Sequence, residues 1–114
     1  MRFVLLLLLF ISAFSAMAQV RRGHPPPPKN LQLLQPSEVQ AQMSAYRIAL
    51  GVPCAYCHMP GADYASDDNP NKAISRRMIT LTRHINAELG GSQVRVTCFT
   101  CHRGAQMPPT VPAQ

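Results

Sequence analysis

Apolar residues recur at helical spacing in two stretches of the chain, which predicts two amphipathic helices. The first helix is expected to start with Ser37 as its N-cap, and Gln40 would complete a capping box. Its apolar face consists of Val39, Met43, Tyr46 and Leu50. Gly51 and Pro53 predict its end, because glycine favours the C′ position and proline cannot continue a helix.

The second helix is expected from about Pro70 to Leu89. Asn69 and Pro70 make a favourable pair for the N-cap and the first helical position. Its apolar face consists of Ile74, Met78, Leu81, Ile85 and Leu89. Glycines directly after Leu89 predict its end. Because no strand-rich pattern accompanies these helices, the fold class predicted is a small, mostly α-helical protein.

The N-terminal segment, residues 1–18, has the features of a secretory signal peptide. Arg2 precedes an apolar run from Phe3 to Phe14, and Ala16-Met17-Ala18 supplies a cleavage site before Gln19. The apolar run is short for a membrane span, which needs about 20 residues. The sequence therefore predicts an exported protein, periplasmic or extracellular, whose membrane contact is peripheral or made through a partner.

The remaining chain divides by composition into three parts. Residues 19–35 contain four consecutive prolines and are expected to form an extended N-terminal tail. Residues 36–104 hold both predicted helices and are expected to form one domain. Residues 105–114 include three prolines and are expected to be an irregular C-terminal tail.

All four cysteines of the chain lie in two C-x-x-C-H motifs. The motifs are Cys54-Ala55-Tyr56-Cys57-His58 and Cys98-Phe99-Thr100-Cys101-His102. This pattern is the attachment signal of c-type haem. Within one helical turn, residues three apart face the same way, so both thiols can add to one porphyrin while the histidine ligates its iron. The sequence predicts two covalently bound haem c groups, with His58 and His102 as iron ligands.

Other cysteine chemistry fits the pattern less well. Paired C-x-x-C motifs that bind zinc are usually about 15–20 residues apart, and the separation of Cys57 and Cys98 is roughly double that. A thioredoxin-like dithiol needs a strand-helix-strand context that is missing here. Disulfides are an alternative in an oxidising compartment.

Composition agrees with a haem-filled interior. The chain has no Trp, and three of its four Phe lie within the predicted signal peptide, so a core built from the polypeptide alone would be marginal. Two porphyrins would supply the missing apolar interior. The formal net charge of +6 would be largely offset by four haem propionates, so it is weak evidence for a nucleic-acid partner, and none is expected.

Met43 and Met78 are the candidate iron ligands opposite His58 and His102. Each lies at the centre of an apolar helical face and precedes a haem motif through a helix-breaking turn. Methionine on such a face usually fills a core, so the assignment competes with a packing role. His84 is a further candidate to meet a haem, although it is rotated away from Met78 around the helix. The repeated order of methionine helix, turn and motif suggests an internal duplication.

The sequence resembles the photosynthetic reaction centre cytochrome c subunit family. The residues that carry the likeness are Met43, Leu50-Gly51-Val52, Cys54 to His58, Arg76-Arg77-Met78, Leu81-Thr82-Arg83, Ile85-Asn86 and Val96 to Gly104. The resemblance extends over roughly 37–109 and implies a two-haem relative, half the length of the four-haem subunit that delivers electrons to a photo-oxidised pigment pair. By resemblance, Met43 and Met78 match the methionine ligands of that family.

We therefore expect an electron carrier and not an enzyme. Its partners would be redox proteins, either other cytochromes or a membrane electron-transfer complex such as the reaction centre itself. Two alternatives remain open. A small peroxidase-like enzyme or gas-binding protein would need one five-coordinate haem, and a structural zinc module would need the cysteines to converge on one metal.

Overall fold

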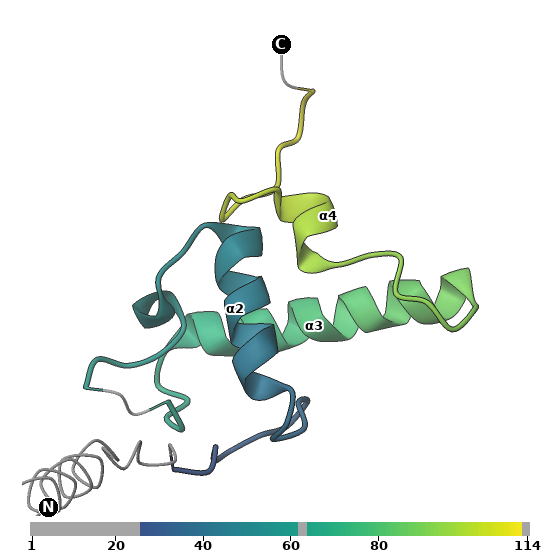
Figure 1. Ribbon diagram of the computed structural model, residues 1–114. Coiled ribbons are helices and arrows are strands. Elements are labelled where there is room, and N and C mark those ends of the chain that lie inside the picture. The colour runs from purple at the N-terminus through teal and green to yellow at the C-terminus, as the bar shows by residue number, and fades with distance from the viewer. Residues whose placement is uncertain (1–25, 62–63, 113–114) are drawn as a thin grey trace, which may run out of the picture.

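The computed structural model describes residues 26–61 and 64–112 of the 114-residue chain. It confirms a mostly α-helical fold, with α2 (Val39–Leu50), the 3₁₀ helix η1 (Cys54–Tyr56), α3 (Pro70–Leu89) and α4 (Cys98–His102), and without strands in these two ranges. The predicted signal peptide, residues 1–18, lies outside the described residues. In Figure 1, α2 runs across α3, and α4 lies beside the C-terminal end of α2.

The predicted start of α2 is wrong. The helix begins at Val39 with Glu38 as its N-cap, and no side chain caps it. Ser37 lies in the preceding turn, and the Glu38 carboxylate instead accepts a hydrogen bond from the Gln35 backbone N–H at 2.9 Å. A glutamate that closes the turn locally replaces the Ser37–Gln40 capping box. The end was predicted correctly, since Gly51 takes a left-handed conformation with φ 64° and bonds to the Arg47 carbonyl.

The predicted bounds of α3 are confirmed. Its N-cap is Asn69, whose side-chain oxygen accepts the Asn71 backbone N–H at 3.0 Å, and Pro70 occupies the first turn, where its missing N–H costs nothing. Gly90, with φ 63°, ends the helix. Although α3 is 20 residues long, no helix within the described ranges is long and apolar enough to cross a membrane.

The two C-x-x-C-H motifs have different backbone conformations. The second motif forms the α-helix α4, as expected, whereas the first forms only the single 3₁₀ turn η1. Pro53 is the residue before η1 and has an extended conformation, with ψ 165°. Because three 3₁₀ residues give one tight turn, the first motif is held less by its own backbone and depends more on neighbouring elements.

Close packing of the elements centres on two glycines. Helix α4 packs against α2 and, less extensively, against α3. The Gly104 backbone N–H, just beyond α4, donates to the Ala49 carbonyl of α2 at 2.8 Å. A Cβ atom placed on Gly51 would overlap the Gly104 carbonyl oxygen. The two backbones can therefore approach this closely only because position 51 has no side chain.

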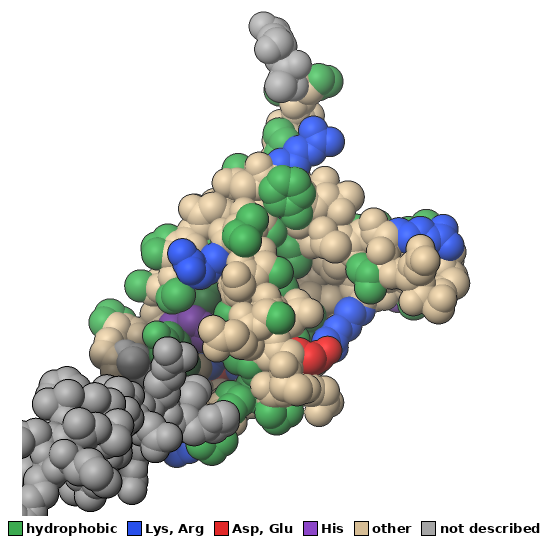
Figure 2. Space-filling model, viewed as in Figure 1, with side chains coloured by type: hydrophobic (Ala, Val, Ile, Leu, Met, Phe, Trp, Pro, Cys, Tyr) green, Lys and Arg blue, Asp and Glu red, His purple; other side chains and the backbone are tan. Residues whose placement is uncertain are grey.

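The polypeptide itself forms very little apolar core. Among the described hydrophobic residues only Ala49 is buried, at 3% exposure. Apolar residues along α3 remain substantially exposed, including Ile74, Leu81 and Leu89. Figure 2 shows hydrophobic side chains scattered over the visible surface. Among the described residues, burial of apolar side chains therefore contributes little to holding the elements together, and polar contacts contribute correspondingly more.

The close approach of the Gly51 and Gly104 backbones leads to a prediction about stability. Gly51→Ala should destabilise the protein by ~1–3 kcal/mol more than Gly61→Ala, because its methyl group would push the Gly104 carbonyl away. Gly61 is a matched control, since it also has a positive φ of 85° but no described atom lies within 4 Å of the place its methyl group would take. Urea unfolding followed by circular dichroism measures both. Equal losses in the two variants would contradict a close crossing at Gly51.

Candidate functional site

The first motif forms a compact turn between α2 and the loop that leads to α3. The His58 and Cys57 backbone N–H groups both donate to the Cys54 carbonyl, at 3.0 and 3.2 Å. Both cysteines are free thiols; Cys54 is exposed, and Cys57 is half-buried with its sulfur 3.3 Å from the Ser75 hydroxyl of α3. The turn therefore keeps both thiols of the motif available for bonding.

His58 lies against the following loop. Its ring contacts the Tyr64 ring edge-on, with centroids 4.9 Å apart. The Nδ1 atom is buried and has no hydrogen-bond partner among the described residues. Burial, followed by the positive charge of Lys72, lowers the pKa of His58, and a backbone hydrogen bond with Tyr64 opposes this shift. The lowered pKa favours the neutral imidazole, which is the form that ligates a metal.

The second motif is a capped helical turn. Thr97 and Thr100 form a capping box at the start of α4, in which the Thr97 backbone N–H donates to the Thr100 hydroxyl at 3.0 Å. Cys98 is a half-buried free thiol and Cys101 an exposed one. Burial is the main cause that raises the pKa of Cys98, and the neighbouring Cys101 adds to it. This capping box was not predicted from the sequence.

His102 is held by the residues that follow it. Its Nδ1 lies 3.0 Å from the Ala105 carbonyl oxygen. A carbonyl can only accept, so Nδ1 donates in this contact, and in the neutral imidazole Nε2 then has a lone pair available to a metal. Arg103, with φ 53°, and Gly104, with φ 84°, make the left-handed turn that brings Ala105 back to the ring. The two motif histidines therefore differ at Nδ1, because the described residues supply a hydrogen-bond partner to this atom in His102 and none in His58.

Asparagine side chains hold the first motif to α3. The Asn69 and Asn71 amides both donate to the Tyr56 carbonyl, at 3.1 and 3.0 Å. The Tyr56 carbonyl belongs to the C-x-x-C-H turn, so the first turn of α3 fixes the position of that motif. The sequence indicated Asn69 only as an N-cap, and this second role was not predicted.

A single asparagine holds the segment before the second motif. The Asn86 side-chain oxygen accepts the backbone N–H groups of Arg95 and Val96, both at 2.9 Å. Its amide donates to the Val96 carbonyl at 2.7 Å and to the Thr82 carbonyl at 2.9 Å. Asn86 thus ties Val96, two residues before Cys98, to α3. Its only sequence signal was membership of the Ile85-Asn86 pair shared with the resembled family.

The candidate methionines lie on separate helices. Met43 is half-buried on α2, and Met78 is 42% exposed on α3. Tyr46, one turn from Met43, lies near the second motif: burial raises its pKa and the nearby Cys98 adds to this effect. The helix that carries Met43 therefore contacts the second motif, a proximity that was not predicted from the sequence. His84 is exposed and faces Glu88 at 4.0 Å.

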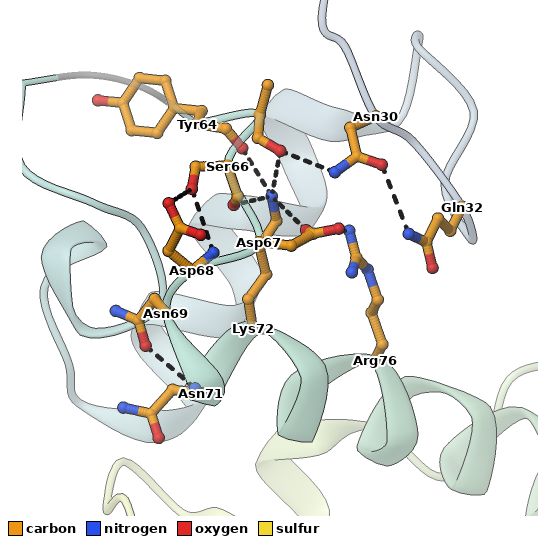
Figure 3. A network of polar contacts seen from close by, with 11 residues as sticks. Asn30, Gln32, Tyr64, Ser66, Asp67, Asp68, Asn69, Asn71, Lys72 and Arg76 are labelled. Atoms are coloured by element: carbon orange, nitrogen blue, oxygen red, sulfur yellow. Dashed lines mark hydrogen bonds and ion pairs between the residues drawn. The ribbon is translucent and has the colours of Figure 1, made fainter.

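The loop between the first motif and α3 is organised by one lysine (Figure 3). The Lys72 ammonium donates to the carbonyls of Tyr64, Ala65 and Ser66, at 3.0, 3.0 and 2.6 Å. It also pairs with the Asp67 carboxylate at 3.1 Å, which Arg76 contacts at 2.9 Å. The loop is therefore anchored to α3, and this anchor holds Tyr64 where its ring meets His58.

Comparison with known proteins identifies the family of this chain. Residues 29–114 match the model of the family described as photosynthetic reaction centre cytochrome C subunit. The chain belongs to this family.

Individual members of the reaction centre cytochrome c subunit family are similar over parts of their length. The photosynthetic reaction center cytochrome c subunit of Thermochromatium tepidum is 47% identical over 48% of this chain and 14% of its own length. That of Rubrivivax gelatinosus is 34% identical over 73% of this chain and 23% of its own. Cytochrome c-554 of Chloroflexus aurantiacus is 42% identical over 50% of this chain and 15% of its own. The chain thus matches less than a quarter of each of these relatives.

The matched family and these relatives are described as cytochromes c, a class of protein whose haem is bound covalently. The residues present fit such a group. Four free thiols lie in two C-x-x-C-H turns, and the tautomer of His102 leaves Nε2 available. Within the described ranges, no three His, Cys, Asp or Glu side chains converge as they would on a zinc ion. The two cysteine pairs therefore do not form the single four-thiolate cluster of a zinc module.

The Asp67 contacts predict an acid-dependent loss of stability. Hydrogen bonds from Arg76, Asn30 and Lys72 hold the pKa of Asp67 well below its usual range. A carboxyl group with a lowered folded-state pKa stabilises the protein above its unfolded pKa of ~4, and this contribution is lost as the pH falls further. Asp67→Asn should therefore lose less stability than the unsubstituted protein between about pH 5 and pH 2, as measured by urea unfolding.

Asp68→Asn is the matched control for this experiment. Asp68 is the neighbouring exposed residue. Its carboxylate accepts a hydrogen bond from the Ser66 hydroxyl at 2.7 Å, and its backbone N–H donates to the Ser66 hydroxyl oxygen at 3.1 Å. This variant keeps the Asp67 contacts with Lys72 and Arg76, so the acid-dependent loss of stability that they cause should persist. An identical pH profile for Asp67→Asn would show that the Asp67 ion pairs do not stabilise the loop.

Proposed function

We propose that this protein is an exported dihaem c-type cytochrome that transfers single electrons between redox partners. Two haem c groups would each be bonded to one motif, through Cys54 and Cys57 in the first and Cys98 and Cys101 in the second. His58 and His102 would ligate the two irons, with Met43 and Met78 on the opposite faces. The bound groups supply the redox chemistry, since haem iron changes oxidation state by one electron.

The hydrogen bond between His102 Nδ1 and the Ala105 carbonyl is the observation that best supports this proposal. An axial histidine needs its second nitrogen anchored, because this fixes the ring orientation and increases the basicity of the ligating nitrogen. The polypeptide provides this anchor directly after a C-x-x-C-H motif. The free state of all four thiols agrees, since each has a bonding role in a two-haem protein.

The chain's own residues would also exclude water from the iron ligands. The half-buried Cys57 and Cys98 mark the protein-facing side of each motif, and the exposed apolar face of α3 offers Ile74, Met78 and Leu81 to a flat apolar group. Burying these side chains would remove apolar surface from water at about 25 cal/mol per Å². Haem attachment and folding should therefore be strongly coupled.

The polypeptide features favour electron transfer over catalysis. With a histidine and a methionine on each iron, no coordination position would be open to substrate, and methionine ligation would give comparatively high potentials. Export to the periplasm or cell exterior follows from the predicted signal peptide. A redox protein, or a membrane complex such as a reaction centre, would be the partner. The family name supports a photosynthetic partner as one member of this class.

The haem count tests the proposal directly. Intact mass spectrometry of the protein exported from cells competent in cytochrome c maturation should give the chain from Gln19 plus two haems. Changing both Cys54 and Cys57 to Ser should remove one haem, and changing Cys98 and Cys101 should remove the other. A wild-type mass equal to the bare polypeptide would overturn the proposal.

The methionine ligands have a separate spectroscopic test. Met43→Ala and Met78→Ala should each remove one methionine-to-iron absorption feature from the oxidised protein and lower one midpoint potential, because water or another donor is a weaker partner for ferrous iron. Met107→Ala is a control, since Met107 is 74% exposed and lies beyond the second motif. Unchanged spectra in both ligand variants would refute the assignment. Rapid, stoichiometric binding of carbon monoxide to one haem of the reduced wild-type protein would favour an enzyme or gas-binding protein.

A further inference from the structure

The segment after the second motif connects three otherwise separate parts of the protein. Within residues 102–106, His102 Nδ1 meets the Ala105 carbonyl, and the Gly104 N–H donates to Ala49 at the end of α2. The Gln106 side-chain amide donates to the Tyr56 hydroxyl. Tyr56 is part of the first motif, so this segment joins His102 of the second motif to the first motif.

The Ala105 carbonyl lies between the two anchors of this segment. Its position is fixed on one side by Gly104, docked on α2, and on the other by Gln106, docked on Tyr56. The Ala105 N–H also donates to the His102 carbonyl at 2.9 Å, which closes the turn. The carbonyl that orients the His102 ring is therefore held by contacts that originate outside the second motif.

The two motif histidines depend on this segment to different degrees. His58 Nδ1 is buried without a partner among the described residues, and its ring packs on Tyr64, outside residues 102–106. Loss of the Tyr56–Gln106 contact would therefore change the environment of His102 and leave the ring contact of His58 with Tyr64 intact. A change made in the first motif would thus act on the second histidine.

We propose that Tyr56 and Gln106 are positioning residues for His102, which couple the geometry of the first haem motif to the axial ligand of the second. This inference rests on the proposed dihaem function. A firmly held Ala105 carbonyl strengthens the Nδ1–H hydrogen bond and makes Nε2 more basic, which favours ferric iron. The link therefore lowers the potential of the second centre.

The test compares Tyr56→Phe and Gln106→Ala with the unsubstituted haem-loaded protein. In the reduced, diamagnetic state, proton NMR measures exchange of the His102 Nδ1–H with solvent. Each variant should exchange about tenfold faster, the factor that corresponds to ~1.4 kcal/mol. Spectroelectrochemistry should show a rise in the potential of the second centre only. The double variant should show no more than the larger single effect, because both changes break one contact.

Two matched variants control for loss of a hydroxyl or an amide alone. Tyr64→Phe removes the hydroxyl of the tyrosine whose ring contacts the other histidine, and Gln93→Ala removes an exposed amide from the loop before the second motif. Both should leave exchange at His102 unchanged. The coupling is overturned if the control variants speed up exchange at His102 as much as Tyr56→Phe does. It is also overturned if Tyr56→Phe and Gln106→Ala change neither the exchange at His102 nor the potential.

The haem content of each sample separates this inference from the proposed function. A chain without haem overturns the dihaem proposal, and exchange at His102 in that chain still decides whether Tyr56 and Gln106 hold the ring. A chain with two haems whose His102 exchange is insensitive to Tyr56 and Gln106 overturns the coupling alone.

Discussion

The contact between the Gly104 N–H and the Ala49 carbonyl is the constraint on which the arrangement of the two motifs depends. It joins the end of α2 to the end of α4, and it requires a glycine at position 51 because the Gly104 carbonyl occupies the space of a side chain. Helix α2 leads directly into the first motif, and α4 is the second motif. The crossing therefore fixes the second motif against the helix that leads into the first motif.

Polar side chains take over much of the role that an apolar core has in other small domains. Asn86 fixes the approach to the second motif, and Asn71 fixes the turn of the first. Lys72 donates to three loop carbonyls and so anchors the loop to α3. Such contacts specify geometry well but contribute only about 0.5–1.5 kcal/mol each. A protein with this construction needs further apolar burial, which haem would provide in the function proposed above.

The difference between His58 and His102 gives the two proposed centres distinct properties. His102 has a carbonyl partner for Nδ1, whereas the Nδ1 of His58 is buried without one among the described residues. Since hydrogen bonding at Nδ1 increases the basicity of the ligating nitrogen, the second centre should have the lower potential if the other ligands are equal. The turn that follows one motif can thus give two motifs with the same sequence signature different potentials.

The sequence alone determined the elements whose signals are local. Helical periodicity together with Asn69, Pro70 and Gly90 predicted α3 with its observed bounds, and the C-x-x-C-H spacing with the accompanying residues indicated the family that the comparisons confirmed. The start of α2 was mispredicted because Glu38 satisfies the Gln35 N–H and displaces the Ser37 capping box. Sequence spacing also could not show that the first motif is a 3₁₀ turn and the second an α-helix.

Only the tertiary structure decided which distant residues meet. The contacts of Lys72 with the loop, Asn86 with Val96, and Tyr56 with Gln106 all depend on how the helices cross, and no local pattern encodes them. The physical reason is that hydrogen-bond donors and acceptors are abundant along any chain, whereas backbone approach selects which of them pair. Gly51 and Gly104 allow that approach, and the position of the His102 ring follows from it.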